Sequence, residues 1–199
     1  ILPFMAGGDH LCTLTCLRAI RKARGEAVGL ILLDSHTDLY PPYFGGKTLT
    51  HGNPFRQAIE EGCIDPKRSI MVGMRGTSYN NEDFQYGWDK GVTIVPAEEC
   101  FERGWMDVMA QAREIAGQGP VYTSFDIDFI DPAFAPGTGT PEVGGPSSAE
   151  AIACVRALSG LNIIGADLVE VSPPFDPSGN TAWLGASIMF EMLCAIQGA

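Results

Sequence analysis

The sequence of 199 residues has few basic side chains and no long apolar run. Thirteen Lys and Arg stand against 24 Asp and Glu, which gives a formal net charge of −11. A charge of this sign repels phosphate backbones and anionic lipid surfaces, so we expect neither nucleic acid nor a membrane as partner. The longest apolar run, residues 27–33, is far shorter than the about 20 residues that a membrane-spanning helix needs.

The six cysteines include no CxxC pair and are too sparse for a small scaffold held together by disulfides. Most lie in apolar stretches, which predicts buried thiols in a reducing compartment. The amino end, ILPFMAGGDH, shows no secretory or transit signal, so we expect an intracellular and most simply a cytoplasmic protein. The chain begins in what resembles the middle of a strand, as a fragment would.

Apolar stretches of strand length alternate with helical ones along the whole chain. Strands are predicted at residues 27–34, 69–76, 91–99, 120–128 and 162–171, and helices at 11–23, 55–62, 105–117, 147–158 and 181–195. A capping box, Ser147 to Glu150, opens the fourth helix. This order predicts one α/β domain over residues 1–199, with a mostly parallel sheet between two helical layers.

Ligands of such sheets bind beyond the carboxyl ends of the strands, and the polar clusters of this chain lie there. The segment 131–148, DPAFAPGTGTPEVGGPSS, follows a strand and reads as a long functional loop. It fits neither glycine-rich nucleotide motif, so no nucleotide cofactor is predicted.

The segment LLDSHTDLY places three metal-ligating side chains at alternate positions after an apolar run: Asp34, His36 and Asp38. If the segment stays extended, the three side chains point to the same face, because side chains alternate along a strand. The segment SFDIDFIDP repeats the pattern with Asp126 and Asp128.

A third predicted strand end carries His10, in GGDH. Neighbouring strands lie about 4.8 Å apart, so these groups can converge on two ions about 3.5–4 Å from each other. The four aspartates would repel one another at a buried site unless two divalent cations neutralised them. Oxygen-rich ligation with two imidazoles suits Mn²⁺, while spacing alone leaves Ni²⁺, Co²⁺ and Zn²⁺ open. A single strand-end Asp more often caps a helix or forms a turn, but the three motifs together favour the metal site.

The segments GGDH, DSHTD, SFDIDFIDPAFAPGTGTPE and DLVEVSPPFD closely resemble the ureohydrolase family of arginases and agmatinases, nearest its agmatinase and guanidino-acid hydrolase branch. The resemblance covers nearly the whole chain. It implies an arginase-like three-layer fold and a binuclear manganese centre that hydrolyses a guanidinium group to urea and an amine. It also suggests a homo-oligomer, either a trimer or a hexamer.

The resemblance also implies a role for each site residue. One metal ion would be held by His10, Asp34, Asp38 and Asp126, and the other by His36, Asp34, Asp126 and Asp128. Glu170 matches the carboxylate that binds the guanidinium, and His51 the histidine that relays a proton. The alternative readings are a surface carboxylate at a strand end for Glu170 and an idle, exposed loop histidine for His51.

Hydrolysis would proceed by attack of a metal-bridging hydroxide on the guanidinium carbon. Agmatine is the leading substrate, and an ω-guanidino acid, as in a guanidinobutyrase or guanidinopropionase, is the alternative. An acidic pocket mouth would favour the amine of agmatine, whereas Arg75 or Lys47 there would favour a carboxylate. Alternatively, Arg75 has a structural role and pairs with acidic loops.

Three features depart from the family pattern. Ser35 stands where many members have Ala, Pro146 stands where a larger apolar residue is common, and the usual amino-terminal region is absent. A non-catalytic relative that binds a metal or a partner is therefore the alternative from a different functional class.

Overall fold

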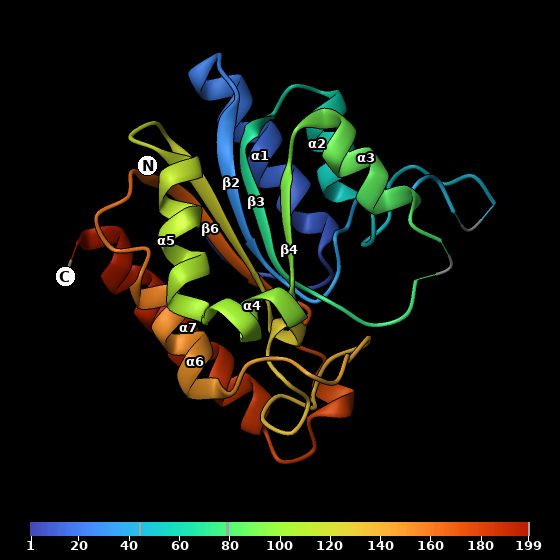
Figure 1. Ribbon diagram of the computed structural model, residues 1–199, viewed down its shortest axis with the longest axis vertical. Coiled ribbons are helices and arrows are strands. Elements are labelled where there is room, and N and C mark those ends of the chain that lie inside the picture. The colour runs from blue at the N-terminus through green and yellow to red at the C-terminus, as the bar shows by residue number, and fades with distance from the viewer. Residues whose placement is uncertain (44, 79, 199) are drawn as a thin grey trace.

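The computed structural model describes residues 1–43, 45–78 and 80–198, and within them six parallel strands form one sheet (Figure 1). The strands are β1 (Phe4–Ala6), β2 (Val28–Leu33), β3 (Ile64–Met74), β4 (Thr93–Pro96), β5 (Val121–Asp126) and β6 (Ile163–Val169). The helices are α1 (Leu11–Arg24), α2 (Pro54–Glu60), α3 (Glu82–Lys90), α4 (Ala97–Arg103), α5 (Trp105–Ala116), α6 (Ser148–Arg156) and α7 (Asn180–Gln197). The predicted α/β class and parallel sheet are confirmed.

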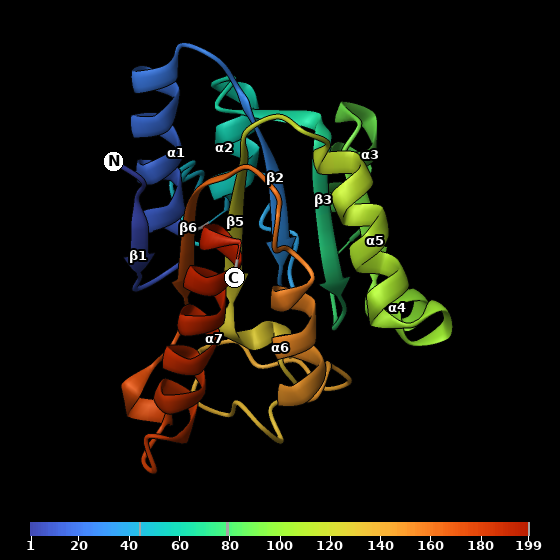
Figure 2. The same cartoon turned by 90° about the vertical axis from the view of Figure 1, so that its left-hand side faces the viewer.

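Helices cover both faces of the sheet because the side chains of its central strands alternate between two apolar cores. Leu30 and Leu32 of β2 pack in one core with residues of α1 and α2. Ile31 and Leu33 pack in the other core with residues of α5, α6 and α7. Figures 1 and 2 show the resulting three layers, with α1 to α3 on one side and α4 to α7 on the other.

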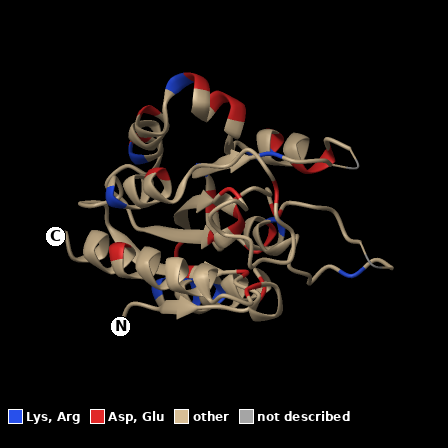
Figure 3. Cartoon of the chain, turned by 90° about the horizontal axis from the view of Figure 1, so that it is seen from below, with Lys and Arg blue, Asp and Glu red and all other residues tan. Residues whose placement is uncertain are grey.

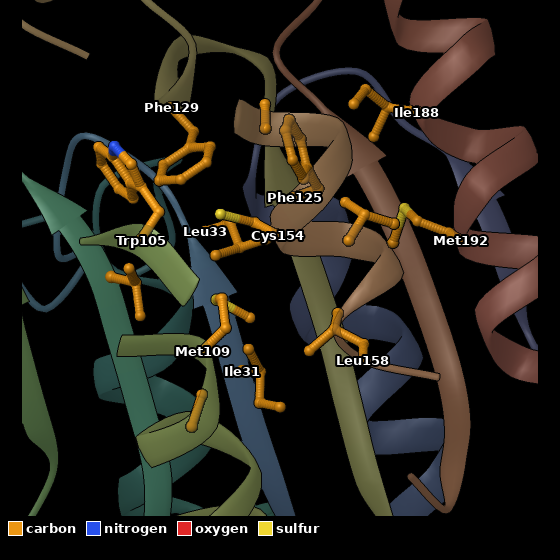
Figure 4. Packing of buried hydrophobic residues seen from close by; sticks show 14 of the residues in the cluster. Ile31, Leu33, Trp105, Met109, Phe125, Phe129, Cys154, Leu158, Ile188 and Met192 are labelled. Atoms are coloured by element: carbon orange, nitrogen blue, oxygen red, sulfur yellow. The ribbon is translucent and has the colours of Figure 1, made fainter. Parts of the chain in front are cut away.

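Aromatic rings close the second core beneath the carboxyl edge of the sheet (Figure 4). Phe129 packs edge-to-face against Phe125 and Trp105, with ring centroids 5.6 and 5.4 Å apart. Such aromatic pairs add to the stabilisation from buried area. This packing fixes the segment that follows β5 and gives the polar side chains next to it a rigid base.

The strand order β1-β6-β5-β2-β3-β4 places a topological switch point between β5 and β2. From β2 the chain adds β3 and β4 in one direction, and it then returns to add β5 and β6 on the other side of β2. Open α/β sheets bind ligands at the carboxyl ends of the strands beside such a switch point.

Several parts of the predicted element pattern were wrong, among them one strand end and one helix. The strand expected over residues 91–99 ends at Pro96, and α4 begins at Ala97, with Glu98 and Glu99 in its first turn. Acidic side chains are favourable there because they face the positive end of the helix dipole. Helix α3 was not predicted at all. The capping box of Ser147 and Glu150 is confirmed, with both of its reciprocal hydrogen bonds.

No helix in the described residues is long and apolar enough to cross a membrane. All six cysteines are free thiols. Cys63, Cys100 and Cys154 are buried as expected, whereas the remaining cysteines are half-buried.

Leu17 lies fully buried in the core between α1 and the sheet, so its truncation tests that core. We predict that Leu17→Ala lowers the free energy of unfolding by about 2–5 kcal/mol, because it removes buried apolar contacts and leaves a cavity. Leu193→Ala, on the exposed face of α7, is the control and should change that free energy by about 0.5 kcal/mol or less. Equal losses in a urea titration of the two variants would contradict this account of the core.

Candidate metal centre

Acidic side chains gather at the carboxyl edge of the sheet, on both sides of the switch point. Asp34 directly follows β2, and Asp126 is the last residue of its neighbour β5. Figure 3 views the molecule from this edge and shows Asp and Glu concentrated near its middle. Both carboxylates are almost completely buried. The two strands therefore hold negative charges close together in a place that water hardly reaches.

The segment from Asp34 to Asp38 is bent, so the condition under which its three side chains would share one face is not met. Strand β2 ends at Leu33, and the backbone N–H of His36 donates a hydrogen bond to Oδ1 of Asp34 at 2.7 Å. Asp38 has a left-handed backbone, with φ of 50°. The bend, rather than strand alternation, sends Asp34 and Asp38 to one imidazole and His36 to a different carboxylate.

The same correction applies to Asp126 and Asp128. Strand β5 ends at Asp126, and a short 3₁₀ helix, Ile127–Phe129, carries Asp128. The backbone N–H of Asp128 donates to Oδ1 of Asp126 at 2.8 Å. The turn places Asp128 beside His36 while Asp126 faces His10.

The first group of potential metal ligands surrounds His10. Its Nδ1 atom lies 3.2 Å from Asp34 Oδ2, 3.0 Å from Asp38 Oδ2 and 3.2 Å from Asp126 Oδ2. His10 directly precedes α1, and the chain from β1 reaches this position by crossing the end of β6. Gly7 permits that crossing, because a Cβ atom there would lie 2.8 Å from a methyl group of Val169.

The second group consists of Asp34, His36 and Asp128, and it shares Asp34 with the first. His36 Nδ1 lies 3.0 Å from Asp128 Oδ2 and 3.8 Å from Asp34 Oδ1. Ser35, one of the departures from the family pattern, donates its hydroxyl to Asp128 Oδ1 at 2.7 Å. The donor atoms lie within 4.8 Å of one another in the set of His10, Asp34 and Asp126 and in the set of Asp34, His36 and Asp128.

The distances from His10 Nδ1 to its three carboxylate neighbours are those found between two ligands of one cation. Ligand atoms about 2.1 Å from an ion, at tetrahedral or octahedral angles, lie about 3.0–3.4 Å from one another. The oxygens around His10 Nδ1 match this spacing. Buried polar atoms normally have hydrogen-bond partners, yet neither His10 Nδ1 nor Asp34 Oδ2 makes a hydrogen bond of acceptable geometry. The residues present therefore fit a metal ion.

Glu170 contacts the first group directly, and His51 lies in the loop before α2. Glu170 is half-buried after β6, and its Oε1 accepts a hydrogen bond from the backbone N–H of His10 at 2.7 Å. His51 is exposed in the loop before α2, and its ring meets the Tyr43 ring edge-to-face. The six predicted metal ligands and Glu170 are thus brought together at one edge of the sheet.

The model of the Arginase family matches residues 1–194. The chain belongs to the arginase family. It is 50% identical over 198 residues to the guanidinobutyrase of Pseudomonas aeruginosa, covering 100% of this chain and 61% of that protein. With the mitochondrial agmatinase of Gallus gallus it shares 48% over 197 residues, covering 99% of this chain and 57% of the relative.

The solved structure of the proclavaminate amidino hydrolase from Streptomyces clavuligerus superimposes with a TM-score of 0.90 at 41% identity. The match covers 98% of this chain and 64% of that one. The arginase-like fold is therefore confirmed. The chain spans roughly three fifths of the length of these relatives.

The charges at the site shift the pKa values of its groups strongly. Burial alone would lower the pKa of His36, but Asp128 and the other nearby carboxylates raise it to about 10. Burial, together with the charge of Asp128, raises the pKa of Asp34 to about 8. Burial would also raise the pKa of Asp128, but hydrogen bonds from His36 and Ser35 lower it to about 2. A divalent ion would therefore compete with protons for the Asp34 carboxyl group and the His36 imidazole.

Three buried polar residues behind the site were missed from the sequence. Asp167 of β6 hydrogen-bonds to Ser124 of β5, which in turn contacts His10. Asp83 of α3 accepts a hydrogen bond from the Thr37 hydroxyl at 2.6 Å and so anchors the bend between His36 and Asp38. The sequence did contain one indication of Asp167. It interrupts an apolar strand, where a buried carboxylate without a partner is costly.

Arg75 holds the loops around the second group and does not point a free guanidinium at the site. It donates hydrogen bonds to the backbone carbonyls of Gly73, Asp128 and Glu142. Burial lowers the pKa of Arg75, and the acidic neighbours oppose that effect. Of the two roles considered for Arg75, this arrangement favours pairing with the acidic loops.

The competition between protons and metal ions leads to a testable expectation. Because metal-bound imidazole is neutral and the pKa of His36 is about 10, Mn²⁺ binding at pH 7.5 should release protons. Apparent affinity should therefore rise with pH across the range below about 10, since fewer protons must then be displaced. Titration calorimetry in two buffers with different protonation enthalpies measures the release. Identical binding heats in both buffers would contradict it.

Proposed function

We propose that this chain is the metal-binding part of an amidinohydrolase of the agmatinase type, which hydrolyses a guanidinium C–N bond to give urea and an amine. One observation carries the proposal: two groups of metal-ligating donors share Asp34 and lie beside the carboxylate of Glu170. The names of the arginase-family relatives, among them a guanidinobutyrase and an agmatinase, support the same chemistry. A non-catalytic relative would not need both groups together with Glu170.

In this proposal two Mn²⁺ ions share the site, and Ni²⁺ or Co²⁺ are the alternatives. The first position would take His10, Asp34, Asp38 and Asp126, and the contacts of His10 support this set. The second would take His36, Asp34 and Asp128, whose donor atoms lie together, with Asp126 added by the family resemblance. A bound metal pair would make water nucleophilic at neutral pH. The four carboxylates balance the four positive charges of two divalent ions.

Glu170 would bind and orient the substrate in this site. A carboxylate can accept two parallel hydrogen bonds from a guanidinium, which fixes both its plane and its distance. The hydrogen bond from the His10 backbone holds the Glu170 side chain at the site. Burial raises the pKa of Glu170, and the charges of His10 and His51 oppose that rise. A cationic guanidinium at the same place would favour the ionised carboxylate.

His51 would deliver a proton to the departing amine. An imidazole can act as both proton donor and proton acceptor in catalysis. Its exposed place in the loop before α2 allows exchange with solvent. The edge-to-face contact between His51 and Tyr43, with centroids 6.3 Å apart, restricts the direction in which the ring points.

Agmatine is the substrate that the surroundings favour. The donors of Arg75 are directed to backbone carbonyls, which leaves a substrate carboxylate without that partner. Glu142 Oε1 lies 3.9 Å from His36 Nε2 and adds negative charge beside the second group. A primary ammonium suits such surroundings better than a carboxylate does. An ω-guanidino acid remains the alternative, because the relatives include a guanidinobutyrase.

The family resemblance further suggests a homo-oligomer, either a trimer or a hexamer. Light scattering on the purified protein measures the mass that decides between these states and a monomer.

The proposed activity is tested by urea release from agmatine and from 4-guanidinobutyrate, measured side by side with added Mn²⁺. We predict release from agmatine in preference to the acid, and loss of release after chelation of the metal. Asp126→Asn keeps the size of the side chain but removes one negative ligand, so it should abolish most of the activity. Urea from neither compound, nor from other guanidino compounds, would sink the proposal and favour the non-catalytic reading.

Substitutions of Glu170 and of His51 should change the kinetic constants in different ways. Glu170→Gln keeps an oxygen that can accept from the His10 backbone but removes the charge, so kcat/KM for agmatine should fall about 10- to 150-fold. His51→Asn should lower kcat by about 10²- to 10⁴-fold through loss of proton transfer, with a smaller change in substrate affinity. Unchanged kcat/KM in the Glu170→Gln variant would remove Glu170 from substrate binding.

A further inference from the structure

Behind His10, a chain of hydrogen bonds crosses two neighbouring strands. Ser124 of β5 and Asp167 of β6 are directly paired in the parallel register, so their side chains lie next to each other on the face that α1 covers. The Ser124 hydroxyl donates to Asp167 Oδ1 at 2.6 Å. Its oxygen also lies 2.9 Å from His10 Nε2. All three side chains are fully or almost fully buried.

The direction of this chain is set at Asp167. Its other oxygen, Oδ2, accepts hydrogen bonds from the Tyr122 hydroxyl at 2.6 Å and from the Thr13 hydroxyl at 2.8 Å. Three hydroxyl groups therefore donate to one carboxylate, as an ionised carboxylate requires, because it can only accept. Ser124 has a single proton and directs it to Asp167. Toward His10 the Ser124 oxygen can then only accept. His10 must therefore be the donor, and the proton of this hydrogen bond is on Nε2.

We propose that Asp167, acting through Ser124, is a positioning residue that keeps the ring proton of His10 on Nε2, so that the Nδ1 lone pair faces the three carboxylates and is ready for a divalent cation. The inference rests on the proposed metal centre and assigns the residues that prepare one half of it. Outer partners of this kind fix the orientation and raise the basicity of ligating histidines.

The surrounding packing is shaped to keep the relay in place. Gly165 leaves room for the Tyr122 ring to reach Asp167, since a Cβ atom at Gly165 would lie 2.7 Å from that ring. The Phe55 ring meets His10 edge-on, with centroids 5.0 Å apart, which opposes rotation of the imidazole. A buried carboxylate in a strand interior is costly, and an apolar residue would stabilise the fold better. A role toward the site explains why an aspartate stands there.

The relay serves only one of the two ligand groups. His36 Nε2 faces Glu142 Oε1 at 3.9 Å, beyond hydrogen-bond range, and its side chain remains 20% exposed. Loss of the relay should therefore weaken the His10 position and spare the His36 position. General damage to the fold would weaken both.

The experiment is Mn²⁺ titration by calorimetry into metal-free wild-type protein, Ser124→Ala and Tyr122→Phe. The wild type should bind two ions. In Ser124→Ala the affinity of one position should fall about 10- to 100-fold while the other is retained. Tyr122→Phe is the matched control, because it removes a hydrogen bond from the same carboxylate but leaves Oδ1 free for Ser124, and its two affinities should stay near wild type.

A spectroscopic measurement reads the ring proton directly. The chain has only three histidines, so the imidazole ¹⁵N signals of Zn²⁺-loaded protein can be assigned with His36 and His51 variants. Wild type and Tyr122→Phe should show a proton on His10 Nε2 that exchanges slowly with water. That proton should exchange rapidly in Ser124→Ala. Asp167→Asn should weaken the same position, since an amide can donate to Ser124 and reverse the relay, and it replaces Ser124→Ala if that variant does not fold.

The outcomes separate this inference from the function on which it rests. If wild-type protein binds no divalent ion, both the metal centre and the relay are overturned. If wild type binds two ions and Ser124→Ala binds them equally well with a protected Nε2 proton, only the relay is overturned. An equal loss in Tyr122→Phe would also overturn it, because the effect would then reflect buried packing in general.

Discussion

Mutual repulsion among buried carboxylates is the constraint to which the rest of this structure responds. Pairing of β2 with β5 places Asp34 and Asp126 side by side, and the turn after β5 adds Asp128. The strands cannot move apart to relieve this repulsion without losing the core on both faces of the sheet. Positive charge must come to the site instead, as protons on the imidazoles and on carboxyl groups such as that of Asp34, or as divalent cations.

The backbone at the site is locally strained. Among the described residues, Asp38 and Glu170 are the only non-glycine residues with a left-handed backbone, and both lie at the site. Such conformations cost about 1–3 kcal/mol each and persist where surrounding structure imposes them. Gly73, which has a positive φ, brings β3 close to Asp34, since a Cβ atom there would lie 2.9 Å from the Asp34 carbonyl oxygen. The stabilisation from the two packed cores offsets this conformational strain.

The residues at the site could be predicted from the sequence, but their local geometry could not. Strand ends are visible as apolar runs, and parallel strands bring such ends to one edge, which is why Asp34 and Asp126 were found together. The bend at Asp38 depends on a contact between Thr37 and Asp83, 46 residues away in the sequence. Helix α3 carries that contact and was not predicted, because its nine residues leave few apolar positions from which to read a period.

The two histidines at the site have environments of different stiffness. His10 is held by hydrogen-bonded partners on β5 and β6 and by the ring of Phe55, all within the packed sheet and helices. His36 lies on a bend. The loops next to it are held together by Arg75, which donates hydrogen bonds to the backbone carbonyls of Asp128 and Glu142. Because loops move more readily than strands, His36 is held less rigidly than His10.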